Sequence, residues 1–159
     1  MSKYSVLVAR LNKELTKIQT AVQAAVSQAT KAKNTGDLDY LQAAALSIQN
    51  FYMGVEQAFE EIAKQVDEFV PDGASSHREL LEQMALEIPD IRPPVIQPDT
   101  LTRLSEYRGF RYVVIHRYGF ELYPDRIREL VEALPACGEA LTSDMQVFCE
   151  FLIHLNQAL

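Results

Sequence analysis

Apolar residues recur every three or four positions over most of this chain, which is the spacing that places them on one face of a helix. The first such stripe runs from Leu7 to Ala29 and stops at residues 34–37, Asn-Thr-Gly-Asp, where the glycine can end one helix and the aspartate can cap the next. A second stripe runs from Leu41 to Phe69 and is stopped by Pro71-Asp72-Gly73. Two helices of about thirty residues joined by a short turn predict an antiparallel hairpin.

A short helix and an extended connector are expected next. The short helix is predicted to start after Ser75 and Ser76 and to use Leu80, Leu81 and Met84 as its apolar face. Residues 87–98 contain four prolines and cannot continue as a helix, so they are predicted to be an extended connector.

The last part of the chain predicts two more long helices. Asp99 is expected to cap a helix that reaches Val114 and ends before Gly119. Pro124 fits the first turn of a final helix through Leu155, and Pro135 and Gly138 are expected to kink it. The chain is therefore predicted to be all-α: an up-and-down bundle of four long helices plus a short helix, forming a single domain over residues 1–159.

Composition is that of an ordinary globular domain, with 48% hydrophobic and 23% charged residues. The two cysteines, Cys137 and Cys149, have no histidine nearby at metal-ligand spacing, so they are expected to be reduced core residues of a cytoplasmic protein. The start, MSKYSVLVAR, has too short an apolar run for a signal peptide. No stretch approaches the length of about eighteen apolar residues that a membrane span needs.

The net charge of −7 argues against a nucleic-acid partner until its distribution is considered. The span from residue 103 to residue 128 carries +3, because it has only three acidic residues, and the rest of the chain carries −10. An arginine cluster in an acidic protein indicates a local anion site, although charge alone fits a solvated helix face equally well. Six of the nine arginines form this cluster: Arg103, Arg108, Arg111, Arg117, Arg126 and Arg128.

The most informative segment is the octet RYVVIHRY, from Arg111 to Tyr118. Arginine binds phosphate through a planar fork of donors, and histidine exchanges a proton near neutral pH, which together are what metal-free cleavage of a phosphodiester needs. On an ideal helix Arg111 and Tyr118 share a face, whereas His116 lies about 140° from Arg111. The two side chains therefore converge only if the helix ends near His116, or if a two-fold partner supplies the complement.

Other interpretations of the octet are open. His116 can be a packed histidine stabilised by the helix dipole, with Tyr118 half-buried and Arg111 extended over the bundle. A Ser-His-Asp hydrolase has no G-x-S-x-G motif here, and the histidines of the chain are too scattered for a metal site. A phosphotransfer domain on a four-helix bundle usually carries a lysine three residues after its histidine, and here that position is Gly119.

Arg111, four residues, His116, one residue and Tyr118 form the pattern R-x4-H-x-Y. This pattern resembles that of the HEPN superfamily of ribonucleases, and most closely that of HepT-like toxins, which are paired with MntA-like minimal nucleotidyltransferase antitoxins. The predicted architecture is similar as well, with the motif at the end of a late helix and one long helix after it. The sequence departs from the family at Tyr112, where many members carry a polar residue, often asparagine.

The resemblance implies that the chain is a toxin that cleaves RNA, such as tRNA or mRNA, with neither a metal nor a cofactor. Arg111 and His116 would be the catalytic pair, contributed by both subunits of a homodimer. His116 would act as general acid or base, and Arg111 would stabilise charge on the phosphate oxygens. Tyr118 would be adenylylated by the antitoxin, which would block the site by bulk and like charge. Arg108 and Arg117 are candidates for contacts with the RNA backbone.

A function from a different class is also consistent with the sequence. In this alternative the chain is a non-catalytic helical adaptor whose arginine cluster, from Arg103 to Arg128, docks an acidic partner or a nucleotide. Cleavage of tRNA that survives EDTA but is lost in His116→Ala would separate the nuclease from the adaptor.

Overall fold

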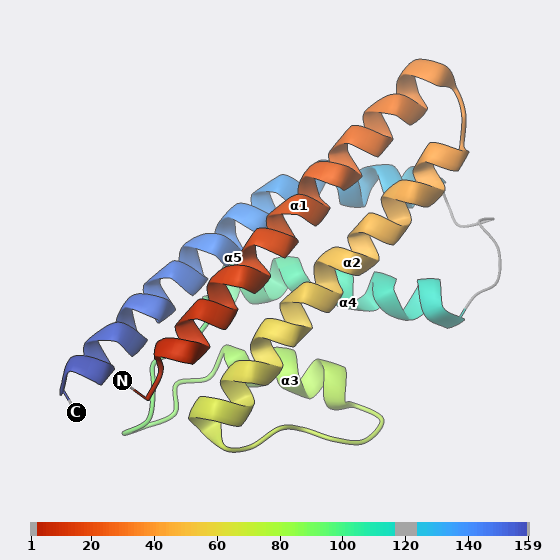
Figure 1. Ribbon diagram of the computed structural model, residues 1–159. Coiled ribbons are helices and arrows are strands. Elements are labelled where there is room, and N and C mark those ends of the chain that lie inside the picture. Colours follow the sequence, from red (N-terminus) through yellow and green to blue (C-terminus); the bar gives the residue numbers. More distant parts are fainter. Residues whose placement is uncertain (1–2, 117–123, 159) are drawn as a thin grey trace.

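The computed structural model describes residues 3–116 and 124–158, with the backbone alone for residues 111–116. Figure 1 shows α1 (Ser5–Thr35) and α2 (Asp39–Ile62) as an antiparallel hairpin, with α5 (Pro124–Ala158) alongside α1. The short helix α3 (Ser76–Met84) and the helix α4 (Pro98–His116) pack against α2. The predicted all-α bundle of four long helices and one short helix is therefore confirmed.

The turn of the α1–α2 hairpin ends α1 at the predicted glycine, but Leu38 and not Asp37 occupies the N-cap position of α2, and its side chain makes no capping hydrogen bond. Gly36 ends α1 in the left-handed conformation, with φ at 73°, and its N–H donates to the carbonyl of Ala32. The carboxylate of Asp37 then accepts a hydrogen bond from the N–H of Asp39 at 2.9 Å, which satisfies one of the free donors at the start of α2. The two helices pack closely, because a Cβ added at Gly54 would lie 2.9 Å from Ile18.

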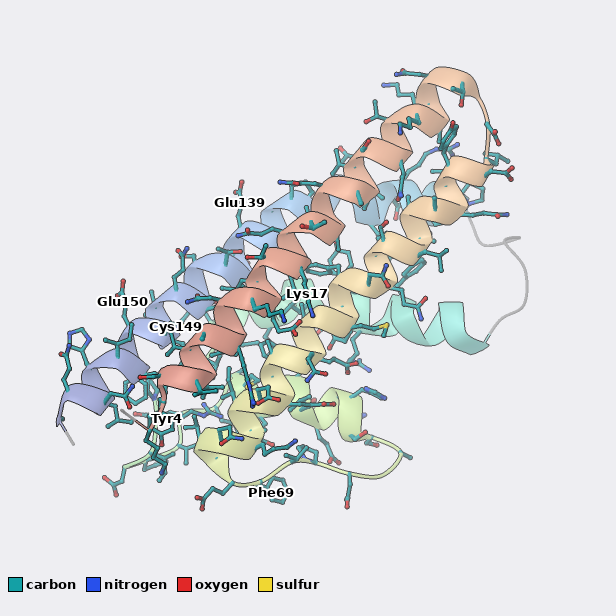
Figure 2. The ribbon with its side chains drawn as sticks, in the orientation of Figure 1. Tyr4, Lys17, Phe69, Glu139, Cys149 and Glu150 are labelled. Atoms are coloured by element: carbon teal, nitrogen blue, oxygen red, sulfur yellow. The ribbon has the colours of Figure 1, made fainter. Side chains whose placement is uncertain are left out.

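The predicted end of the second helix is wrong. Regular α-helix stops at Ile62, a π-helical turn continues through Asp67, and Glu68 then adopts a left-handed conformation with φ at 57°. The wider π turn shifts the register of the apolar stripe, so Asp67 turns inward. Phe69 was predicted to belong to the stripe, but it is 65% exposed and points away from the bundle (Figure 2).

The connector before α4 is anchored by one buried arginine. The guanidinium of Arg92 binds both carboxylate oxygens of Asp67, at 2.6 and 2.8 Å, and neither side chain is more than 2% exposed. The same guanidinium donates to the carbonyls of Leu86, Gln83 and Pro93. The connector is extended as predicted, and this network fixes it to the end of the π-helical turn.

The caps of the two later helices differ from those predicted. Ser75 occupies the N-cap position of α3, but its side chain makes no capping hydrogen bond. Helix α4 begins at Pro98 instead of after Asp99, since proline is favoured in a first turn. Asp99 lies inside that turn, where its carboxylate accepts a hydrogen bond from Arg103 at 2.8 Å.

Helix α5 supplies the long wall of the core and contains both cysteines. It is continuous through Pro135, and Cys137 and Cys149 are free and buried, as predicted. At the other end of the hairpin, the backbone N–H of Tyr4 donates to the side chain of Asn156, which ties the start of the chain to the end of α5. None of the described helices is long and apolar enough to span a membrane.

Replacing Arg92 with methionine should lower the free energy of unfolding by about 3–5 kcal/mol, because Asp67 would be left as a buried charge without compensation. Urea denaturation followed by circular dichroism measures the change. The matched control is Arg78→Met, which removes an exposed ion pair with Glu82 and should change stability by no more than about 0.5 kcal/mol. Equal effects of the two substitutions would contradict the anchoring role of Arg92.

Candidate active site at the end of helix α4

The second half of α4 is held in place by Tyr107. This side chain is 2% exposed, and its hydroxyl donates a hydrogen bond to the backbone carbonyl of Leu130 in α5 at 2.7 Å. Its ring meets that of Phe51 in α2 edge to face, with centroids 5.5 Å apart. One residue therefore connects α4 to α2 and to α5, directly before the segment that carries the predicted catalytic pair.

The sequence of α4 explains why this face turns inward. Thr100, Leu104 and Tyr107 are all buried, and they follow one another at the helical spacing of three or four. On the outer side, Glu106 forms an ion pair with Arg126, which adds a second link between α4 and the start of α5.

The structure places the predicted catalytic pair in the last two turns of α4. Arg111 and His116 both lie in the described part of the helix, and the predicted helix end between His116 and Gly119 lies at the border of the described residues. Five residues correspond to about 140° around a helix axis, so the two positions do not share a face of one straight helix. Arg117 and Tyr118 lie outside the described residues, as do the side chains of Arg111 and His116.

Most described arginines of the predicted cluster are paired with nearby carboxylates. Arg103 binds Asp99, Arg126 binds both Glu106 and Glu129, and Arg128 binds Asp125. The hydrogen bond with Asp99 raises the pKa of Arg103 further above its already high usual value. All these pairs are exposed and add little stability, but they neutralise much of the charge that the sequence assigns to this region.

Arg108 differs from the other described arginines of the cluster. It is half-buried, one turn before Arg111, and its Nε atom is buried without a hydrogen-bond partner among the side chains and backbone that the structure describes. A buried donor without a partner costs free energy that a ligand with an acceptor oxygen can recover. Arg108 is therefore the described residue that best fits a contact with phosphate.

Other chemistry near the site is limited. Burial raises the pKa of the Cys137 thiol to about 12, so the thiol stays protonated at neutral pH and is a poor nucleophile. Burial likewise raises the pKa of Tyr107 above its usual range. In the described part of the chain, His, Cys, Asp and Glu side chains form no group of three that could hold a metal ion.

A second basic segment lies outside the predicted arginine cluster. Helix α1 is strongly basic, and a tally of charge along each predicted helix would have found it. Its C-terminal half lies beside the first turns of α5, so Lys33 and Arg128 line the same groove. The charged residues of α1 are Arg10, Lys13, Lys17, Lys31 and Lys33 against Glu14 alone.

Replacing Tyr107 with phenylalanine should cost about 1 kcal/mol, which is the usual net value of one buried hydrogen bond. The variant should also change the response to alkaline pH. Unfolded tyrosine loses its proton near pH 10, whereas the native pKa is higher, so this group makes the free energy of unfolding fall as the pH rises above about 10.

The fall in the free energy of unfolding that Tyr107 causes at alkaline pH should be absent from Tyr107→Phe. Urea titrations at a series of pH values measure this. Tyr40→Phe is the control, because Tyr40 is only half-buried and its hydroxyl has no hydrogen bond to any described residue. The same alkaline response in all three proteins would show that Tyr107 does not carry the effect.

Comparison with known proteins gives one match. A family model described as HepT-like protein matches residues 43–152, which is more than half of the chain. Neither the search of curated proteins nor the search of solved structures returned a match. The matched range begins inside α2 and contains the whole octet from Arg111 to Tyr118, whereas α1 lies outside it.

Proposed function

Because this chain belongs to the HepT-like protein family, we propose that it is the toxin of a toxin–antitoxin pair and that it cleaves RNA without a metal ion. The observation that carries the proposal is the position of Arg111 and His116. Both residues lie in the last two turns of a helix that Tyr107 fixes to α2 and α5. A catalytic pair needs such a fixed support, since small displacements of reacting groups cost much of the rate.

The proposed reaction uses the 2′-hydroxyl of RNA as the nucleophile. One histidine removes the proton of the 2′-hydroxyl while its oxygen attacks the phosphorus, and the bond from phosphorus to the 5′-oxygen breaks. A protonated acid gives the leaving 5′-oxygen a proton, so the products are a 2′,3′-cyclic phosphate and a 5′-hydroxyl. Arg111 stabilises the negative charge that develops on the phosphate oxygens.

A homodimer resolves the geometry of the two catalytic positions. Arg111 and His116 lie about 140° apart around α4, so a single straight helix does not direct both at one phosphate. A two-fold axis beside the end of α4 would bring Arg111 of one subunit toward His116 of the other. Arg108, half-buried one turn earlier, would contact the RNA backbone together with Arg117.

Control of the toxin is proposed to act on Tyr118, two residues after His116. A minimal nucleotidyltransferase antitoxin would direct the tyrosine hydroxyl to the α-phosphate of ATP, which would form a phosphodiester to AMP and release pyrophosphate. The added phosphodiester is negative and would stand next to the place where the RNA phosphate binds. Bulk and like charge would then exclude the substrate.

The alternative of a non-catalytic adaptor is less favoured by the electrostatics. A docking surface for an acidic partner needs unneutralised positive charge. Arg103, Arg126 and Arg128 are each paired with carboxylates of their own chain, so much of the charge of that surface is already compensated.

The nuclease is tested by incubating purified protein with tRNA in EDTA. His116→Ala should lower the cleavage rate by roughly 10²–10⁴-fold, the range of a lost general acid or base. Arg111→Lys should also be defective, because a point charge does not replace the bidentate fork. His154→Ala is the matched control, since His154 is exposed on α5 and binds only the carbonyl of Glu150 among the described residues. Equal rates for wild type and His116→Ala would refute the assignment.

The switch is tested by co-expression with a minimal nucleotidyltransferase, followed by mass spectrometry of the intact toxin. Wild type should gain one or more AMP units and lose its nuclease activity, and Tyr118→Phe should gain none. Tyr40→Phe should be modified like wild type. AMP on the Tyr118→Phe variant would place the modification elsewhere, and a monomer in light scattering would contradict the shared site.

A further inference from the structure

A groove lies between the C-terminal half of α1 and the first turns of α5. Its volume is about 780 Å³, which is within the range of pockets that hold small ligands. Its walls are mainly apolar, with Val26 and Ala29 on the α1 side and Val131 and Pro135 on the α5 side. Such walls can accept the flat, weakly polar face of a nucleobase.

Two cations line this groove. Lys33 is exposed on α1 and has no ion pair with any described residue, so its charge is available to a ligand. Arg128 uses Nη1 for a hydrogen bond to Asp125 at 2.9 Å, and its other donors have no partner within the described part of the chain. Glu132 is the carboxylate among the lining residues, and Asp125 compensates part of the charge of Arg128, so Lys33 is the cation of the lining without an ion pair in the described part of the chain.

The groove belongs to a longer path along the same seam. Pro135 also lines a second groove of about 330 Å³ between α1 and α5, where Gln23 and Ser143 contribute uncharged polar groups. Glu139 is the one carboxylate among the residues that line this second groove, and the other lining side chains are apolar, amide or hydroxyl groups. Apolar and uncharged polar walls with a lysine at one end suit a flexible strand with bases and phosphates better than they suit a folded acidic protein.

The groove is also close in the chain to the proposed active site. Arg128 lies four residues after Pro124, where α5 begins. The start of α5, the end of α4 and the turn between α1 and α2 all lie on the same side of the molecule (Figure 1). A strand of RNA whose phosphate is at the end of α4 could therefore extend toward the groove.

We propose that this groove is an RNA subsite that holds one base against Val26, Ala29 and Val131 and the adjacent phosphate against Lys33 and Arg128. The inference rests on the proposed function, because it assumes that RNA is the substrate. It adds a residue set outside the range matched by the family, since Lys33 belongs to α1.

The test measures binding separately from cleavage. The parent protein carries His116→Ala so that the RNA stays intact, and a short fluorescein-labelled single-stranded RNA is titrated in EDTA at a series of salt concentrations. Lys33→Glu and Arg128→Glu should each raise the dissociation constant and reduce the steepness of the slope of log K against log salt by about 0.7, the value for one lost phosphate contact on a single strand. Ala29→Phe, which fills the groove, should weaken binding without changing that slope.

Lys13→Glu is the matched control. Lys13 is an exposed lysine on the same helix without an ion pair to a described residue, and it lies about 30 Å from Lys33 at 1.5 Å per residue. The proposal requires that Lys13→Glu bind RNA like the parent. Equal weakening by Lys13→Glu and Lys33→Glu, unchanged binding in the groove variants, or a parent that binds no RNA would each overturn the subsite.

Failure of the subsite and failure of the nuclease give different results. If the wild type cleaves tRNA, and Lys33→Glu and Arg128→Glu cleave and bind as Lys13→Glu does, the subsite is wrong and the nuclease stands. If the groove variants weaken RNA binding as expected but the wild type never cleaves RNA, the groove binds RNA and the proposed nuclease is wrong.

Discussion

The hydrogen bond from the hydroxyl of Tyr107 to the carbonyl of Leu130 is the contact on which the geometry of the candidate site depends. Helix α4 is approached through an extended connector, so α3 alone does not set its direction. The ring of Tyr107 packs edge to face on Phe51, and its hydroxyl reaches α5, so one side chain fixes α4 against two helices. The hydroxyl is buried and would cost free energy without its acceptor, which makes alternative positions of α4 unfavourable. This contact determines the position of the helical turns that carry Arg111 and His116, whichever reaction the two residues perform.

The helices could be predicted because the apolar residues of each helix recur with helical spacing in the sequence. The stripe from Leu7 to Ala29 and the Gly36 turn depend only on local spacing and backbone preference, and both were confirmed. The π-helical turn could not be predicted, since the local spacing of apolar residues does not indicate it, and the Arg92 that pairs with its Asp67 is distant in the sequence. The prediction of Phe69 as a core residue is wrong for the same reason. The spacing of apolar residues does not show where a wider helical turn changes which side chains face inward.

The candidate site was only partly accessible from the sequence. The octet identified α4 as the helix of interest, and the match to the HepT-like family covers that helix. The predicted arginine cluster carries less free charge than its sequence indicates, because the sequence does not show which carboxylates lie beside each arginine in space. Asp99, Glu106 and Asp125 neutralise three of them across short distances, whereas the lysines at the end of α1 were passed over. Pairing of this kind is decided by helix packing, and net charge along a segment does not report it.

The position of α1 bears on how the proposed catalysis and RNA binding could be divided within the fold. The family match covers α3, α4 and most of α5, which include the supports of the octet, but it does not include α1. Helix α1 supplies one wall of the groove and its free lysine, while α5 supplies the other wall and is also bonded to Tyr107. A change in the side chains of α1 would therefore alter the groove without disturbing the hydrogen bond that positions α4. Under the proposed function, changes in the side chains of α1 would change which RNA the groove binds. The helix that carries Arg111 and His116 would keep its position.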